Sequence, residues 1–190
     1  MMSLFRDRLK ARGTRGITKL QSIFKMMDDD GSGSLNLFEF TKACREFKVG
    51  ISEEYLPTLF NAFDLNHDAT LSVQEFLTAV RGEMNERRIQ AVQNAWAKIA
   101  PQGVLDMHEL KDLFKADRHP DVVKGKRMAR EVLNEFLETF ETSMNVSQTS
   151  QDGSVTFDEF LEFHRNVSFI FEDDTHFVLT INGVWAVNAQ

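Results

Sequence analysis

The sequence of 190 residues has little of what marks secreted, membrane-spanning or disulfide-stapled proteins. Its one cysteine, Cys44, cannot form an internal disulfide, and this fits a reducing compartment. No long apolar run and no charged-then-apolar leader is present, so we expect neither a membrane span nor a signal peptide. Met1-Met2-Ser3 also lacks the glycine that myristoylation requires. Together these absences predict a cytoplasmic protein without a membrane anchor.

Signatures of catalysis are missing too. The five histidines form no HExxH motif and no Cys/His cluster, and there is no phosphate-binding glycine loop. No Ser/His/Asp set can be nominated. We therefore expect a protein that is not an enzyme.

Basic residues are concentrated at one end of the chain. Residues 1–27 hold seven Lys/Arg against Asp7 alone, a net charge of +6, while the remainder holds 15 basic and 28 acidic residues, a net of −13. An acidic body suits cation sites and argues against nucleic-acid binding. The basic N-terminus is either a solvated helix face or a surface that meets an acidic protein or membrane.

One twelve-residue stretch, residues 28–39, carries oxygen atoms at the spacing that wraps a hard cation. The candidate ligands are the side chains of Asp28, Asp30, Ser32 and Asn36, the carbonyl of Ser34, and both carboxylate oxygens of Glu39. Gly33 at position 6 permits the positive φ that the sharp turn demands. An acidic surface turn is the simpler alternative, but apolar stripes at helical spacing flank this stretch on both sides. The pattern predicts an EF-hand that binds Ca²⁺, with Mg²⁺ as a competitor for the loop.

A second loop, residues 64–75, begins 36 residues after the first. Its candidate ligands are Asp64, Asn66, Asp68, the Thr70 carbonyl, Ser72 and Glu75. Ala69 stands at position 6, where a left-handed conformation costs about 1–2 kcal/mol, so we expect weaker binding here. His67 should be exposed. Leu35 and Leu71, both at position 8, should join the two loops through a short two-stranded ladder.

The third and fourth loops depart from this pattern. In residues 98–109, Lys98 and Ala100 replace the first two side-chain ligands, so we expect no calcium there. One hypothesis is that Lys98 neutralises Glu109. Counting back from Glu159 gives a fourth loop, residues 148–159, in which an amide, Gln148, stands at position 1. Its other positions hold Ser150, Asp152, Gly153, Ser154, Val155 and Thr156. The stretch 141–151 resembles an expanded loop, which leaves another register open, and calcium binding by this hand is undecided.

These repeats predict an all-α fold of two EF-hand pairs, arranged as calmodulin-like lobes with short two-stranded β ladders. We assign residues 1–16 to a basic extension, 17–83 to the first pair, 84–167 to the second, and 168–190 to a tail that docks on a lobe. Residues 81–88 are polar and are expected to form a hinge between the pairs. The tail helix, capped near Asp173, either completes the C-terminal core or lies in a lobe's groove as a built-in ligand.

Several motifs together resemble calcyphosin and the calcyphosin-like proteins over nearly the whole chain. They are Arg12-Gly13 to Gly16-Ile17, Asp28-x-Asp30-Gly31-Ser32, His119-Pro120-Asp121-Val122 with Gly125, Glu131-Val132-Leu133 to Phe136-Leu137, and Asp152-Gly153-x-Val155-Thr156 with Glu159-Phe160. The resemblance implies an intracellular calcium-binding protein with two EF-hand pairs, similar to proteins of ciliated cells. The third loop lacks the aspartates of that family, and the fourth is longer.

Two functions follow from these observations. The first is a calcium sensor or adaptor that exposes a groove to an unidentified protein target. The expected groove residues are Phe24, Met27, Phe60, Phe63 and Met84. The second is a structural component, for example of a ciliary axoneme or the cytoskeleton, whose docking does not need Ca²⁺.

Overall fold

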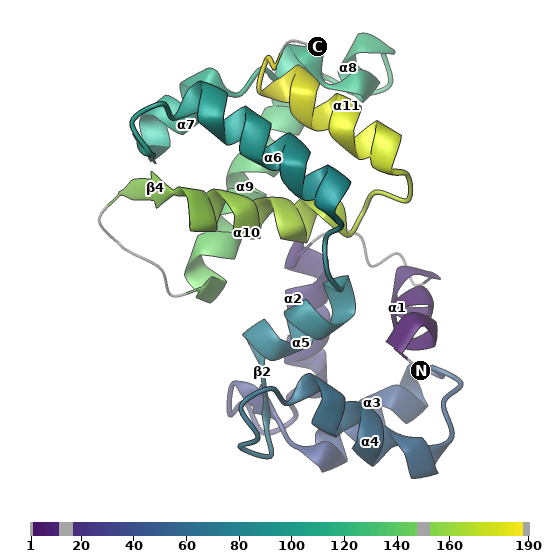
Figure 1. Ribbon diagram of the computed structural model, residues 1–190. Helices are drawn as coiled ribbons and strands as arrows, with labels where there is room; N and C mark the ends of the chain where they lie inside the picture. The colour runs from purple at the N-terminus through teal and green to yellow at the C-terminus, as the bar shows by residue number, and fades with distance from the viewer. Residues whose placement is uncertain (1, 12–16, 148–152, 188–190) are drawn as a thin grey trace. The chain divides into compact units, whose positions relative to one another are not determined.

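The computed structural model describes residues 2–11, 17–147 and 153–187, and it divides into two compact units, residues 1–83 and 84–190 (Figure 1). Both units are built from helices that flank loops, and in each unit two loops are joined by a short antiparallel ladder. This confirms the predicted all-α class with paired loops. None of the helices in the described ranges has the length and apolar character needed to cross a membrane.

Unit 1 places a helix on each side of its two loops. Its elements are α1 (Met2–Ala11), α2 (Ile17–Met27), β1 (Ser34–Leu35), α3 (Leu37–Glu46), the 3-10 helix η1 (Glu53–Tyr55), α4 (Leu56–Phe63), β2 (Leu71–Ser72) and α5 (Val73–Arg81). Strand β1 pairs with β2 in the register Ser34↔Ser72 and Leu35↔Leu71. The ladder predicted between the two position-8 leucines is therefore confirmed.

The core of unit 1 is a cluster of aromatic rings from all four loop-flanking helices. Phe24, Phe40, Phe60, Phe63 and Phe76 are each buried. The ring of Phe24 packs against Phe76 at a centroid distance of 5.6 Å, and that of Phe40 packs against Phe60 and Phe63 at 5.7 Å each. The apolar stripes predicted on both sides of the loops supply these rings, because positions three and four apart share one face of a helix. Cys44 also lies in this core, where burial raises the pKa of its thiol to about 12.

Helix α1 belongs to the same core. Phe5 and Leu9, four residues apart and so on one helix face, are 1% and 0% exposed. The ring of Phe5 lies 5.5 Å from that of Phe63 and 5.8 Å from that of Phe40. The sequence predicted only a basic extension for residues 1–16, without a role in the core. Charge dominated that interpretation, although two apolar residues at helical spacing were present.

Unit 2 contains the remaining elements. They are α6 (Glu86–Ile99), β3 (Val104–Asp106), α7 (Met107–Leu113), η2 (Ala116–Arg118), α8 (Pro120–Val123), α9 (Ala129–Ser147), β4 (Ser154–Thr156), α10 (Phe157–Ser168) and α11 (Asp174–Val184). Strand β3 pairs with β4 so that Leu105 faces Val155. The pairing places Val155 at position 8 of the fourth loop, the position that the count back from Glu159 assigned to it.

Helix α11 lies against α6 and is part of the core of unit 2 (Figure 1). Phe177, Ile181 and Trp185 are buried, and the indole Nε1 of Trp185 donates to Nε2 of buried His164 at 3.1 Å. Deep burial lowers the pKa of His164 to about 4, so this ring is neutral at pH 7. Trp185 therefore has a hydrogen-bond partner for its one polar atom.

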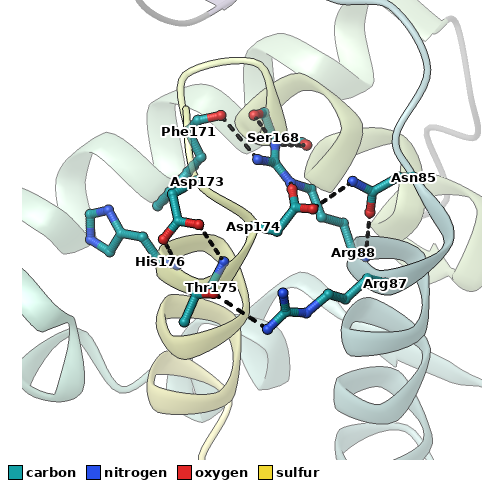
Figure 2. A network of polar contacts seen from close by, with 9 residues as sticks. All are labelled: Asn85, Arg87, Arg88, Ser168, Phe171, Asp173, Asp174, Thr175 and His176. Atoms are coloured by element: carbon teal, nitrogen blue, oxygen red, sulfur yellow. Dashed lines mark hydrogen bonds and ion pairs between the residues drawn. The ribbon is translucent and has the colours of Figure 1, made fainter.

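A polar network fixes the start of α11, as Figure 2 shows. The guanidinium of Arg88 donates to Asp174 Oδ1 at 2.6 Å, to the Ser168 carbonyl at 2.8 Å and to the Phe171 carbonyl at 3.1 Å. Asn85 caps α6 and also donates to Asp174. The bonds from Asn85 and Arg88 lower the pKa of Asp174, so this carboxylate stays charged. One buried arginine thus ties α6 to both ends of the turn between α10 and α11.

Three expectations need correction in this part of the chain. Residues 81–88 are not a polar hinge throughout, because Arg88 lies within α6 and is buried. Met84 packs into the core of unit 2, so it does not belong with the groove residues of unit 1. The supposed expanded loop 141–151 is helical as far as Ser147, since α9 continues through it.

Candidate metal centre

The first loop gathers three carboxylates around one point. Ligand oxygens of Asp28, Asp30 and Glu39 all lie within 4.8 Å of one another, and in the described ranges these three form the one such group of acidic, histidine or cysteine side chains. Ca²⁺ prefers oxygen ligands at about 2.3–2.6 Å from the ion, so two oxygens on opposite sides of one ion lie about 5 Å apart. The 4.8 Å limit in the first loop agrees with this separation. The donor set is chemically that of a calcium site.

Backbone amides hold these carboxylates in place. Asp28 accepts hydrogen bonds from the amides of Ser32 at 3.0 Å and Gly33 at 2.9 Å, while Glu39 Oε1 accepts from Asp29 at 3.0 Å. The side chain and amide of Ser32 lower the pKa of Asp30. The Ser32 hydroxyl also donates to the Ser34 carbonyl at 3.0 Å, which brings together the two ligands expected at positions 5 and 7.

The last ligand of the loop is also part of the next helix. Glu39 is the third residue of α3, where its Oε2 accepts from the Asn36 amide while Asn36 Oδ1 accepts from the Glu39 amide. This reciprocal capping box links positions 9 and 12 at the start of the helix. Glu39 is only 3% exposed, so its carboxylate already faces the loop interior. The carboxylate of Glu39 therefore belongs both to the loop and to the first turn of α3.

The second loop repeats the arrangement with nearly the same partners. Asp64 accepts from the amides of Asp68 and Ala69, and Glu75 accepts from those of Leu65 and Ser72. Burial alone would raise the pKa of Glu75, but its hydrogen bonds from Ser72, Asn66 and Leu65 outweigh burial and lower it. The hydroxyl and amide of Thr70 lower the pKa of Asp68, as Asn66 also does. The predicted side-chain ligands of this loop are connected by hydrogen bonds, but Asp64, Asp68 and Glu75 do not form a convergent carboxylate group like that of the first loop.

Two residues of the second loop adopt left-handed conformations. Ala69 has φ of 65°, as predicted for position 6, and His67 at position 4 has φ of 59°. Glycines stand at the matching positions of the first loop, Gly31 with φ of 69° and Gly33 with φ of 82°. Each non-glycine residue in this region costs about 1–2 kcal/mol. The second loop thus holds two non-glycine residues in a strained conformation where the first loop has glycines. The sequence predicted this for Ala69 but not for His67. His67 is exposed, as expected.

The third loop keeps the frame of a hand without the side-chain ligands of positions 1 and 3. Gly103 has φ of 89°, and Asp106 and Glu109 form a capping box at the start of α7. Glu109 is exposed, whereas the equivalent Glu39 and Glu75 are buried. The hypothesis that Lys98 neutralises Glu109 is not supported, because the Lys98 ammonium donates to the carbonyl of Ala186 instead. Its ammonium secures the segment that follows α11.

The fourth loop is described only from Gly153 onward, and Gln148, Ser150 and Asp152 lie outside the described residues. The hydroxyl and amide of Thr156 donate to Glu159 Oε2, and Glu159 is buried. The end of this loop therefore resembles those of the first and second loops more than that of the third.

Comparison with known proteins agrees with this geometry. The family described as an EF-hand domain pair matches residues 17–81, the two loops of unit 1 with their flanking helices. Crustacean calcium-binding protein 23 of Faxonius limosus is 31% identical over 182 residues, which cover 95% of this chain and 88% of that protein. The protein of the same name from Homarus americanus is 26% identical over 83% of this chain and 90% of its own length. An uncharacterized calcium-binding protein of Caenorhabditis elegans, C50C3.5, is 31% identical over 50% of this chain and 51% of its own length.

Proposed function

The chain belongs to the family of EF-hand calcium-binding proteins, and we propose that it acts as an intracellular Ca²⁺ sensor or adaptor whose ion sites are mainly those of unit 1. The observation that carries this proposal is the first loop, in which Asp28, Asp30 and Glu39 already converge. The proposed ligand set is that of the sequence analysis, from Asp28 to Glu39 and from Asp64 to Glu75. Unit 2, with Lys98 and Ala100 in its third loop, has a largely structural role.

The capping boxes supply a mechanism for sensing. Glu39 and Glu75 are each the third residue of an exit helix and each is bonded to position 9 of its own loop. When both carboxylate oxygens of each glutamate bind an ion, the first turns of α3 and α5 move with the glutamates, and the rest of each helix reorients with its first turn. The β1–β2 ladder joins the two loops, so the two movements are coupled. Reorientation of this kind separates helices whose buried faces carry Phe24, Met27, Phe60 and Phe63.

The cellular setting and the partner are proposals of the same kind. A free, buried Cys44 supports a reducing, cytoplasmic setting. The proposed exposure of the groove in unit 1 would suit a protein target. The narrower likeness to calcyphosins, with a ciliary partner, stays a prediction that rests on the motifs quoted above. The two crustacean relatives described above are named calcium-binding protein 23 and not calcyphosin.

A constitutive scaffold is the alternative function. What favours it is unit 2, whose core includes α11 and whose third loop lacks the side-chain ligands of positions 1 and 3. A partner that binds unit 2 away from its fourth loop would bind without Ca²⁺. Binding that persists in Glu39→Gln/Glu75→Gln protein would select this function.

Calorimetric calcium titration in the presence of magnesium, on wild type and on Glu39→Gln/Glu75→Gln, is the direct test. Two sites that vanish in the double variant would match a sensor with its sites in unit 1. A site that remains would show that the fourth loop also binds. Wild type without any calcium site would contradict the sensor and leave the scaffold.

A further inference from the structure

Helix α1 occupies the interior of the proposed calcium-responsive unit. Besides its contacts with Phe40 and Phe63, the Phe5 ring makes an edge-on contact with Phe76 of α5 at 6.5 Å. Without Met84, four expected groove residues remain. Two of them are Phe60 and Phe63, whose rings pack against Phe40. Phe5 thus lies in the space between helices that a target side chain would enter.

The basic face of α1 has its own recognition contacts. Arg6 Nε donates to the Ala79 carbonyl in the last turn of α5 at 2.9 Å, and its guanidinium lies against Gly82, which ends that helix. A Cβ added at Gly82 would stand 2.9 Å from Arg6 Cζ. The guanidinium of Arg8 lies beside Gly50, within 4 Å of a Cβ at that position. Cations near the C-terminal ends of helices interact favourably with their dipoles, so Arg6 suits its position.

Charge complementarity extends to the unit as a whole. Residues 17–83 contain six basic and eleven acidic residues, a net charge of −5, whereas α1 carries three basic residues and Asp7, a net of +2. An apolar pair four residues apart with arginines beside it is the pattern of a helix that binds in a groove. Helix α1 matches its surroundings in shape, polarity and charge.

Helix α1 is held by fewer interactions than α11, the corresponding added helix of unit 2. In the described residues, α1 buries Phe5 and Leu9 and donates one side-chain hydrogen bond to α5. Helix α11 buries four of its residues, accepts a backbone hydrogen bond from Lys115 at Val184, and is followed at once by Trp185 and its bond to His164. Its Gly183 also lies so close to Arg118 that a Cβ would meet the Arg118 carbonyl oxygen at 2.7 Å.

From these contacts we infer that α1 is a built-in, displaceable ligand of the groove in unit 1, and that the target is a basic amphipathic helix with an aromatic and an aliphatic anchor four residues apart. This inference rests on the proposed sensor function and names the class of its partner. The target and α1 compete for one site. Apparent target affinity is therefore reduced by the fraction of molecules in which α1 is docked.

A peptide with the sequence of residues 1–16, carrying a fluorescent label, is a suitable probe because it has the inferred chemistry. Its binding is measured by anisotropy to full-length wild type, to Phe5→Ala/Leu9→Ala, and to Leu4→Ala, which changes an exposed residue of the same helix. With saturating Ca²⁺ we expect at least tenfold tighter binding to the double variant, and no change for Leu4→Ala. Tenfold corresponds to α1 being docked in about nine molecules of ten. A peptide with alanine at both anchors should not bind.

Equal peptide affinity for wild type and the double variant would overturn the inference. If calcium binds and increases dye binding in that same protein, the sensor function survives this failure. Tighter peptide binding to the double variant that is the same with and without Ca²⁺ would instead support the inference and contradict the sensor function. Concentration-dependent dimers of wild type, broken by the double substitution, would assign the groove to α1 of a second copy and overturn the competition.

Hydrogen exchange on wild type keeps the test decisive if the double variant does not fold. Excess unlabelled peptide in Ca²⁺ should increase deuterium uptake in α1 and leave α11 unchanged. Peptide binding without any change in α1 would contradict the inference.

Discussion

The two units share one helix–loop–helix plan but use different means to keep it folded. Unit 1 places its charge in the loops, where Asp28, Asp30 and Glu39 converge with amide donors as their partners. Unit 2 places its charge behind the loops, where Arg88 binds Asp174 and two carbonyls. A cation from solvent would complete the first arrangement, whereas a cation from the chain completes the second. The two units thus differ in where their charges find partners: in unit 1 three carboxylates converge in a loop, and in unit 2 a buried arginine of the chain binds a carboxylate.

The largest effect is expected from removing that internal cation. Arg88→Ala removes the guanidinium from the carbonyls of Ser168 and Phe171 and from Asp174, which keeps only its bond from Asn85; this should lower the free energy of unfolding of unit 2 by about 3 kcal/mol. Urea unfolding followed by tryptophan fluorescence reports this unit alone, because Trp96 and Trp185 both lie in it.

The matched control for this variant is Arg87→Ala. Arg87 donates one exposed bond to Thr175, visible beside Arg88 in Figure 2. Its loss should change stability by a few tenths of a kcal/mol. Equal effects of the two substitutions would show that the buried network does not anchor α11.

The next largest difference between the units is expected in the pH dependence of their stability, because unit 2 contains the buried His164. Since the folded pKa of His164 is about 4 and the unfolded one is 6.5, only the unfolded state gains a proton as pH falls between these values. The stability of unit 2 is full above about pH 7 and falls by about 3 kcal/mol by pH 4. His119, whose pKa burial also lowers, adds to the loss in the same direction.

Urea unfolding in calcium-free buffer at several pH values measures this dependence. His164→Gln keeps an acceptor for Trp185 but cannot titrate, so its stability should depend less on pH. A slope unchanged by that substitution would mean that other groups govern the acid sensitivity.

The difference between the two loops of unit 1 is smaller. Ala69→Gly relieves one left-handed strain and should strengthen calcium binding at the second loop about tenfold, while Gly33→Ala should weaken the first loop by a similar factor. Calorimetric titration of both variants tests the pair. If Ala69→Gly left the weaker site unchanged, backbone strain would not explain its weakness.

The smallest effect is expected at Lys98. Its ammonium donates to the Ala186 carbonyl from an exposed position, so Lys98→Ala should cost unit 2 about 0.5–1 kcal/mol. Urea unfolding compares it with Lys111→Ala, a substitution of an exposed residue on α7. Glu109→Gln should have no effect, because Glu109 is exposed and Lys98 binds elsewhere. A loss in Glu109→Gln equal to that of Lys98→Ala would restore the rejected ion pair.

Much of the candidate site could be predicted from the sequence because its interactions are local. Within the first loop every ligand lies no more than eleven residues from the others, and turn geometry brings them together. Ala69 at position 6 was also predictable, since the loop frame dictates its backbone conformation. The left-handed conformation of His67 was not predicted, although Gly31 stands at the same position 4 of the first loop.

The sequence by itself thus determined the all-α class, the frames of the first three loops and the β1–β2 register, and it predicted the ligands of the first two loops. Only the tertiary structure decided that α1 is a core helix, that Met84 belongs to unit 2, and that Arg88 anchors α11. The reason is separation along the chain. Arg6 contacts a residue 73 positions away and Arg88 one 86 positions away. No periodicity in a short window encodes such a contact, because burial of a charged side chain depends on partners that folding supplies.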